Sequence, residues 1–327
     1  MTKDKQISSI FDITGSDENA LTRSFGVILR KDRTLLKKLI SLVIGKNYKI
    51  SKRLFNNTTF YFEKNHPKGR TDIELINEKI LALDKIPNDF KLSLRERTIL
   101  DCVKNNKIFI DKNAINKFFN SLSYPLIAID FETFNPAIPL FDGTRPYESI
   151  PFQYSIHIVN KLDDKPKHLS FLAEGSEDPR VSLLKSLKKD IPNKGTLLAY
   201  NLTFEKQRLK ELGESFPKYN NWIKFLLPRF KDLMSPFRSL YYYNPQQKGS
   251  YSLKAVLPAL TGESYQDMEL NNGMSANIAF LHITQGDLNG NLPSEKEIKK
   301  LRKELEKYCA LDTKGMVNIL LKLDSVK

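Results

Sequence analysis

The stretch Leu126-Ile127-Ala128-Ile129-Asp130-Phe131-Glu132-Thr133 decides the fold that we expect for this chain. Its unbroken apolar run has the length of a strand, and such runs are typical of central strands buried on both faces. Because side chains alternate along a strand, Asp130 and Glu132 project from the same face. The sequence therefore predicts two adjacent carboxylates on a rigid, buried element.

The segments around this strand predict an α/β fold in which helices flank a mixed sheet. Further strands are expected at Phe152–Val159, His168–Leu172, Thr196–Tyr200 and Phe230–Leu233. Helices are expected at Ser93–Asn105, Lys112–Leu122, Asp178–Lys189, Thr203–Gly213 and Leu253–Leu260, followed by a terminal pair at Ser294–Lys307 and Tyr308–Leu321.

The N-terminal part of the chain predicts a separate small α/β unit over residues 1–80. Two helices are expected within residues 17–44, and the turn Pro67-Lys68-Gly69 separates expected strands at Thr58–Glu63 and Thr71–Ile76. Residues 81–124 then form a helical connector, and residues 125–327 form the main domain.

We expect a cytoplasmic protein whose charge favours nucleic acid as a partner, with a generally lysine-rich proteome as the alternative explanation of the charge. The 327 residues carry a formal net charge of +14, which favours polyanionic partners. No secretory signal is expected in Met1–Ile13, and no apolar run is long enough to cross a membrane. Cys102 and Cys309 are the only cysteines in the chain. We expect both to be reduced and Cys309 to be packed.

Two further acidic segments could join Asp130 and Glu132. Glu205 lies in the first turn of an expected helix, where the helix dipole alone also stabilises an acid. Tyr308 and Asp312 are four residues apart and share one helical face, as ordinary surface neighbours also do. Close carboxylates repel one another unless a cation neutralises them, and hard oxygen ligands select Mg²⁺ or Mn²⁺.

The order of these acids resembles that of proofreading-type exonucleases with four catalytic acids, in the tyrosine subgroup that includes ribonuclease D and polymerase proofreading domains. Residues 82–322 also resemble the bacterial family catalogued as domain of unknown function 2779. The segments that carry this second resemblance are Arg145-Pro146-Tyr147, Pro151-Phe152-Gln153-Tyr154, Gly249-Ser250-Tyr251-Ser252-Leu253-Lys254 and Val256-Leu257-Pro258.

The exonuclease resemblance implies a ribonuclease H-like fold and a 3′–5′ exonuclease that hydrolyses phosphodiester bonds at a single-stranded end of DNA or RNA. Two Mg²⁺ or Mn²⁺ ions would act together. Tyr308 would orient the attacking water, and the metal ligands would be Asp130, Glu132, Glu205 and Asp312. One departure is that the exonuclease pattern has Asp where this chain has Glu205.

Residues expected to contact the substrate lie in or beside these motifs. They are Phe131, Thr133, Arg145, Tyr147, Gln153, Tyr200, Asn201 and Lys254, with packing or surface solvation as the alternative for each. Asp232 is a reserve metal ligand, although a loop or capping role is favoured. His157 and His168 are expected on strands away from Asp312, in structural roles.

The N-terminal unit has a weaker resemblance, to restriction-endonuclease-like nucleases. Glu18 and Gly69-Arg70-Thr71-Asp72 match the opening of that pattern, but Asn77-Glu78-Lys79 and Leu83-Asp84-Lys85 miss its acid-x-Lys spacing. A truncated or degenerate relic that helps to dock DNA is favoured over a second active centre, and surface acids with no role are the default alternative. For the main domain, two alternatives to an exonuclease stay open: a catalytically silent nucleic-acid-binding module, and an endonuclease or resolvase that does not need Tyr308.

Overall fold

The computed structural model describes the backbone of residues 58–62 and 73–77, and residues 92–327 except 176, 267, 271 and 287–289. The chain forms two compact units, Met1–Lys91 and Leu92–Lys327. In the first unit, β1 (Thr58–Phe62) and β2 (Ile73–Asn77) pair antiparallel, which confirms the predicted strand pair. The helices predicted within residues 17–44 lie outside the described residues.

The second unit is built on a five-stranded mixed sheet with the order β6-β5-β4-β7-β8. Strands β4, β5 and β6 form an antiparallel meander, whereas β7 and β8 run parallel to β4. The five strands are β4 (Leu126–Phe134), β5 (Ile150–Val159), β6 (Lys167–Leu172), β7 (Thr196–Ala199) and β8 (Phe230–Asp232). The predicted strands and the mixed sheet flanked by helices are confirmed.

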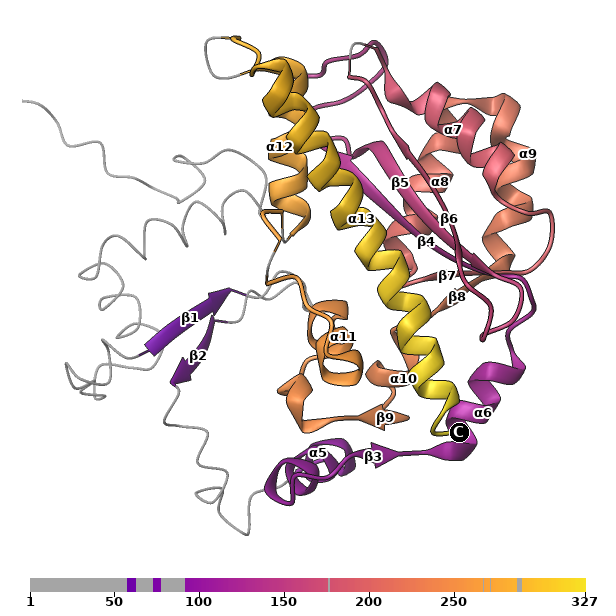
Figure 1. The fold of residues 1–327 in the computed structure, drawn as a ribbon, viewed down its shortest axis with the longest axis vertical. Coiled ribbons are helices and arrows are strands. Elements are labelled where there is room, and N and C mark those ends of the chain that lie inside the picture. The colour runs from indigo at the N-terminus through magenta and orange to yellow at the C-terminus, as the bar shows by residue number, and fades with distance from the viewer. Residues whose placement is uncertain are drawn as a thin grey trace, which may run out of the picture. The chain divides into compact units, whose positions relative to one another are not determined.

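Helices cover both faces of this sheet (Figure 1). One face carries α7 (Pro179–Asp190), α8 (Thr203–Ser215) and α9 (Pro217–Leu226). The other carries α12 (Gly273–Gln285) and α13 (Glu295–Asp324), with α11 (Leu253–Thr261) packed against α13. Each face therefore has its own hydrophobic core.

Side-chain alternation along β4 divides its residues between these two cores. Ile127, Ile129 and Phe131 pack with α7, α8 and α9, whereas Leu126 and Ala128 pack on the side of α13. The same alternation directs the side chains of residues 130 and 132 toward α12 and α13. The two acids thus leave the central strand on the face that the last two helices cover.

The predicted break between two terminal helices is wrong, because α13 is a single helix of 30 residues. Neither proline nor glycine interrupts the segment around Lys307 and Tyr308, so the helix continues from one predicted element into the next. Gly315 lies within it, and a Cβ there would come 2.8 Å from Leu257 Cδ2 on α11. The glycine therefore permits the close packing of α11 on α13.

Several smaller elements escaped sequence analysis. Helices α9 and α12 were not predicted, nor was the pairing of β3 (Phe109–Ile110) with β9 (Tyr242–Tyr243). The helices predicted in the connector, α5 (Leu94–Lys104) and α6 (Lys112–Asn120), belong to the second compact unit. Among the residues that the structure describes, no helix combines the length and apolar character needed to cross a membrane.

The contact of α12 with the sheet generates a stability prediction. Phe280 is buried on α12 and stacks on Phe152 of β5 with ring centroids 3.9 Å apart. Phe280→Ala should lower the free energy of unfolding by about 3–5 kcal/mol, because it removes a fully buried aromatic ring. Ile278→Ala, at a position 59% exposed on the same helix, is the matched control and should change it by less than about 0.5 kcal/mol. Urea denaturation that finds equal losses for the two variants would contradict this packing.

Candidate metal centre

Four carboxylates approach one another near the carboxyl end of β4. Asp130 and Glu132 lie on β4, Glu205 in the first turn of α8, and Asp312 on α13. Glu132, Glu205 and Asp312 are 3–7% exposed, and Asp130 is half-buried. Burial and then the charges of the other three acids raise the pKa of Asp130, so the structure brings the four predicted acids into one electrostatic group.

The position of Glu205 follows from the chain path after β7. This strand is the parallel neighbour of β4, so its carboxyl end approaches the end of β4 that carries the acid pair. The turn that follows contains Asn201 in the left-handed region, with φ +69°, and α8 then begins at Thr203. Glu205 thus enters the site from the start of a helix, where the helix dipole favours an acid.

Burial and mutual repulsion disfavour the ionised forms of these acids. Burial raises the pKa of Glu132 to about 8, with a further contribution from Asp312. It raises the pKa of Glu205 to about 8 and that of Asp312 to about 6. Burial, followed by the neighbouring carboxylates, raises the pKa of Asp130 well above its usual range. The cluster can therefore be fully ionised near neutral pH only if positive charge is added.

One lysine and two tyrosines border the carboxylates. Lys254, at the start of α11, lowers the pKa of Glu132 and Asp312. Its Nζ lies 5.5 Å from the ring centroid of Tyr265 and 5.7 Å from that of Tyr308. The predicted residues Lys254 and Tyr308 thus lie at the site, with the lysine side chain still exposed to solvent.

Tyr265 belongs to the site but was missed by sequence analysis. Its side chain is 6% exposed, and its hydroxyl donates a hydrogen bond to Asp312 Oδ1. It comes from the loop after α11, and no spacing or motif distinguishes it from the other tyrosines of the chain. By occupying one oxygen of Asp312, Tyr265 fixes the orientation of that carboxylate.

Cys309 lies against the same acids. Its Sγ is 3.8 Å from Asp130 Oδ2, and one ligand atom from each of Asp130, Glu132 and Cys309 lies within 4.8 Å of the others. Both Cys309 and Cys102 are buried free thiols. The predicted packing of Cys309 is confirmed, but it packs beside a carboxylate rather than among apolar side chains alone.

The donor atoms present fit divalent cations. Carboxylate oxygens are the ligands that Mg²⁺ and Mn²⁺ prefer. Among the described residues, Glu205 Oε2 and Gln153 Oε1 are buried without a hydrogen-bond partner. Gln153 is the register neighbour of Glu132 on β5 and donates from Nε2 to the Leu305 carbonyl. Each of these unpartnered oxygens could accept a hydrogen bond from water bound to an ion.

Residues at the end of β7 and β8 brace the turn before α8. The Asn201 N–H donates to Asp232 Oδ1, which also accepts from the Met234 N–H. Asp232 Oδ2 pairs with Arg238 at 3.1 Å. Asp232 therefore acts as a capping residue, the role favoured from the sequence. The Tyr200 hydroxyl donates a hydrogen bond to the Tyr251 carbonyl.

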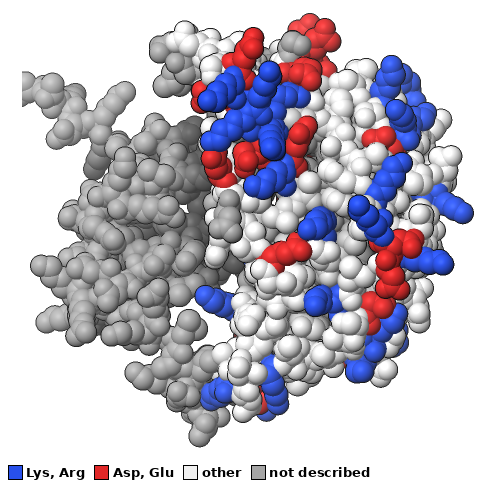
Figure 2. Space-filling model, in the orientation of Figure 1, with Lys and Arg blue, Asp and Glu red and all other residues white. Residues whose placement is uncertain are grey.

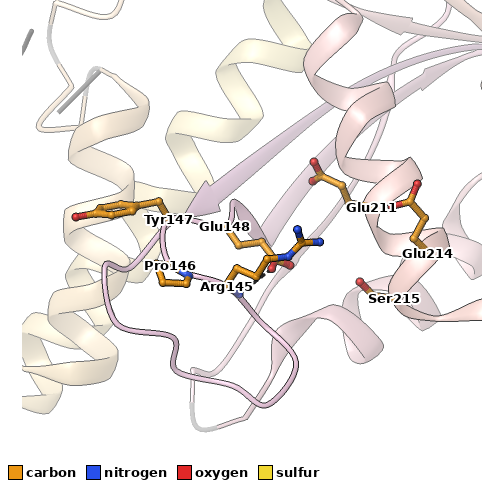
Figure 3. Close-up of a pocket in the computed structure, with 7 residues that line it drawn as sticks. All are labelled: Arg145, Pro146, Tyr147, Glu148, Glu211, Glu214 and Ser215. Carbon is orange, nitrogen blue, oxygen red and sulfur yellow. Dashed lines mark hydrogen bonds between the residues drawn. The ribbon is translucent and has the colours of Figure 1, made fainter. Parts of the chain in front are cut away.

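Three predicted substrate contacts lie away from the carboxylate oxygens or have other partners. Phe131 is buried in the core beneath α7–α9, edge-on to Tyr154. Thr133 is half-buried after a register shift in β4. Arg145 lines a separate pocket of about 450 Å³ and extends toward Glu211 and Glu214 of α8 (Figure 3). A substrate role for these residues stays a prediction.

His157 and His168 lie on β5 and β6, as predicted, and His157 contacts the residue that follows Asp312. His157 Nδ1 is 2.8 Å from Thr313 Oγ1, and Ser155 Oγ is 2.7 Å from the same hydroxyl. His168 stacks on His157 from β6. Because Thr313 follows Asp312 on α13, this buried network anchors the helix to the sheet directly beneath the candidate site.

The raised pKa values generate a pH prediction for protein free of divalent cations. Glu132 and Glu205 have pKa values of about 8 when folded, against an ordinary value of 4.5. Their stabilising protonated state is present at low pH and is lost as the pH rises through the folded value. Unfolding free energy should therefore fall between about pH 6.5 and pH 8, a window above the titration of buried His157.

Thermal denaturation of wild type and Glu205→Gln across this window checks the prediction. The variant should lose less stability with pH, because it removes one of the titrating groups. Added Mn²⁺ should stabilise wild type more at pH 8 than at pH 6.5, because it neutralises carboxylates that are then ionised. Identical pH profiles for the two proteins, unaltered by Mn²⁺, would contradict the electrostatic description.

Comparison with known proteins gives relatives of unassigned function. Residues 127–252 match the family model described as "Domain of unknown function (DUF2779)". The chain is 26% identical over 316 residues to "Uncharacterized protein MG366" of Mycoplasma genitalium, covering 88% of this chain and 45% of that protein. It is 23% identical over 268 residues to "Uncharacterized protein UU173" of Ureaplasma parvum, covering 76% of this chain and 37% of that protein.

The chain spans less than half the length of these curated relatives. No solved structure matches it. The match over residues 127–252 confirms part of the predicted family resemblance, and it runs from β4 to the residues just before α11. The central region of the chain is therefore similar to a domain family whose description assigns no function.

Proposed function

We propose that the chain is a metal-dependent nuclease that trims DNA or RNA from a 3′ end. The observation that carries this proposal is the convergence of Asp130, Glu132, Glu205 and Asp312 in one group with raised pKa values. Burying several acids together costs free energy, and groups with such perturbed pKa values cluster at functional sites. A site that binds divalent cations next to a phosphodiester needs several carboxylates close together.

The fold supports a ribonuclease H-like interpretation. A mixed sheet with helices on both faces carries the acid pair on its central strand, and the remaining acids come from α8 and α13. This order of acids along the chain is the one that resembles the tyrosine-type proofreading exonucleases. The five-stranded sheet and the joint position of the acids are independent of that resemblance and agree with it.

The residues of the site divide into ligands and positioning groups. Asp130, Glu132, Glu205 and Asp312 would hold two Mg²⁺ or Mn²⁺ ions. Once bound, the ions would supply the positive charge that stabilises charge developing on the phosphate during hydrolysis. Tyr265 holds one oxygen of Asp312, leaving the other for a ligand.

Tyr308 and Lys254 have different proposed tasks. Burial raises the pKa of Tyr308 above its ordinary value, so its hydroxyl stays neutral and can hydrogen-bond to an attacking water without giving up its proton. Lys254 combines an exposed side chain with proximity to Glu132 and Asp312. Its ammonium group is suited to a phosphate oxygen of the bound strand.

Two exposed aromatic rings with neighbouring cations, close in sequence to Glu205 and Lys254, suit a single-stranded end. Phe204 directly precedes Glu205, is 38% exposed and lies under the Arg208 guanidinium at 5.0 Å. Tyr251 is 40% exposed and has Arg95 at 5.9 Å from its ring centroid. Stacking platforms next to cations hold single strands without reading their sequence.

The overall charge is consistent with a polyanionic substrate. The chain carries a net charge of +14. Figure 2 shows lysines and arginines gathered with some acidic residues over the N-terminal half of α13, which contains the exposed residues Lys296, Lys299, Lys300 and Lys303. This helix also carries Tyr308 and Asp312. A nucleic-acid strand attracted to the basic N-terminal half of α13 would lie along the helix that carries Tyr308 and Asp312.

Substitution of Asp130 tests the proposal directly. Asp130→Asn should lower Mn²⁺-dependent digestion of end-labelled DNA or RNA at least about 100-fold, because it removes a charged ligand worth several kcal/mol to the transition state. The control is Asp163→Asn, in the exposed turn between β5 and β6, and it should digest at the wild-type rate. Single- and double-stranded substrates identify the preferred nucleic acid. Undiminished digestion by purified Asp130→Asn would defeat the proposal, and binding without digestion by wild type would favour a silent binding module.

The two tyrosines separate an exonuclease from an endonuclease of the same fold. Tyr308→Phe should slow end trimming by about 10- to 100-fold at saturating Mn²⁺, because the attacking water loses its orientation. Tyr265→Phe should instead raise the Mn²⁺ concentration for half-maximal activity by about 10-fold, as expected for loss of a partner to a metal ligand. Unchanged trimming by Tyr308→Phe, together with cleavage of circular DNA, would favour the endonuclease.

A further inference from the structure

Cys309 introduces a soft ligand into a group of hard ones. Its Sγ lies 3.8 Å from Asp130 Oδ2, and the ligand atoms of Cys309, Asp130 and Glu132 lie within 4.8 Å of one another. These three side chains come from α13 and β4, whose positions the Thr313 network and the helix packing fix. Mg²⁺ and Mn²⁺ prefer oxygen ligands to sulfur, whereas Zn²⁺ binds thiolate and carboxylate together.

The separation of Cys309 Sγ and Asp130 Oδ2 suits a single zinc ion. Zinc bonds of about 2.3 Å to sulfur and about 2.0–2.2 Å to carboxylate oxygen together exceed the 3.8 Å between Cys309 Sγ and Asp130 Oδ2. A single ion can therefore contact both atoms without displacement of α13 from β4. Asp130 keeps part of its surface exposed to solvent. Glu205 Oε2, buried without a partner among the described residues, belongs to the same electrostatic group and could accept from a water on the ion.

We propose that Asp130, Glu132 and Cys309 form a Zn²⁺ site that competes with the catalytic cations. On binding, the Cys309 S–H bond breaks, the proton passes to solvent, and sulfur bonds to zinc with no change in oxidation state. The ion then occupies Asp130 and Glu132. Given the proposed nuclease function, on which only this regulatory consequence rests, zinc stops hydrolysis while it stays bound, and a chelator restores it.

The test uses Cd²⁺ as a spectroscopic probe for zinc on the full chain, kept reduced with a phosphine. Bound to a thiolate, Cd²⁺ gives a charge-transfer absorption in the ultraviolet. Wild type should show this absorption, and Cys309→Ser should lose it. Cys102→Ser is the matched control, because Cys102 is the only other cysteine and is also buried, and it should keep the absorption.

Two further arms keep the proposal testable if Cys309→Ser fails to fold. Excess Mn²⁺ should reduce the absorption of wild type, since the two ions share Asp130 and Glu132, and Asp130→Asn should weaken Cd²⁺ binding. In activity assays, the Zn²⁺ concentration that halves trimming should rise in Cys309→Ser relative to that variant's own zinc-free rate. An absorption that persists in Cys309→Ser, vanishes in Cys102→Ser, or is insensitive to both Mn²⁺ and Asp130→Asn would overturn the proposal.

The outcomes also separate this site from the nuclease. If Cd²⁺ binds through Cys309 but no substrate is digested, the zinc site stands and the proposed function fails. If digestion requires Asp130 but no thiolate absorption forms, the nuclease stands and the zinc site fails.

Discussion

The burial of four carboxylates close to one another is the constraint around which the candidate site of the second unit is organised. Asp130, Glu132, Glu205 and Asp312 are brought together by the central strand and two helices, and each has a raised pKa. A fold that clusters ionisable groups in this way sacrifices stability unless a ligand compensates. The two hydrophobic cores on either face of the sheet stabilise the fold against the cost of burying these acids.

Helix α13 is the element that converts a strand with two acids into a site. In one continuous helix it carries Tyr308, Cys309 and Asp312 over β4, and the next residue, Thr313, bonds to Ser155 and His157 on β5. Gly315 of the same helix allows close packing of α11, which carries Lys254 and precedes the loop with Tyr265. The side chains on either side of Asp312 are thereby fixed by contacts that do not depend on a bound ion.

Sequence patterns predicted the parts of this arrangement that depend on local order. The apolar run of β4 indicated a central strand with Asp130 and Glu132 on one face, and the strand-to-helix change indicated Glu205 at a helix start. The spacing of Tyr308 and Asp312 indicated a shared helical face. Tyr265 could not be predicted, because it reaches Asp312 from a loop 47 residues away in sequence. The approach of Cys309 to Asp130 and of His157 to Thr313 likewise depends on how α13 crosses the sheet, which no local pattern encodes.

The central claim is that the four carboxylates form a site for divalent cations, and crystallography with Mn²⁺ tests it most directly. Anomalous difference maps from crystals grown with and without Mn²⁺ locate the ion independently of any activity. The account predicts manganese peaks bounded by Asp130, Glu132, Glu205 and Asp312. Crystals in saturating Mn²⁺ with no peak among these side chains, and with the carboxylates paired to protein cations instead, would contradict it.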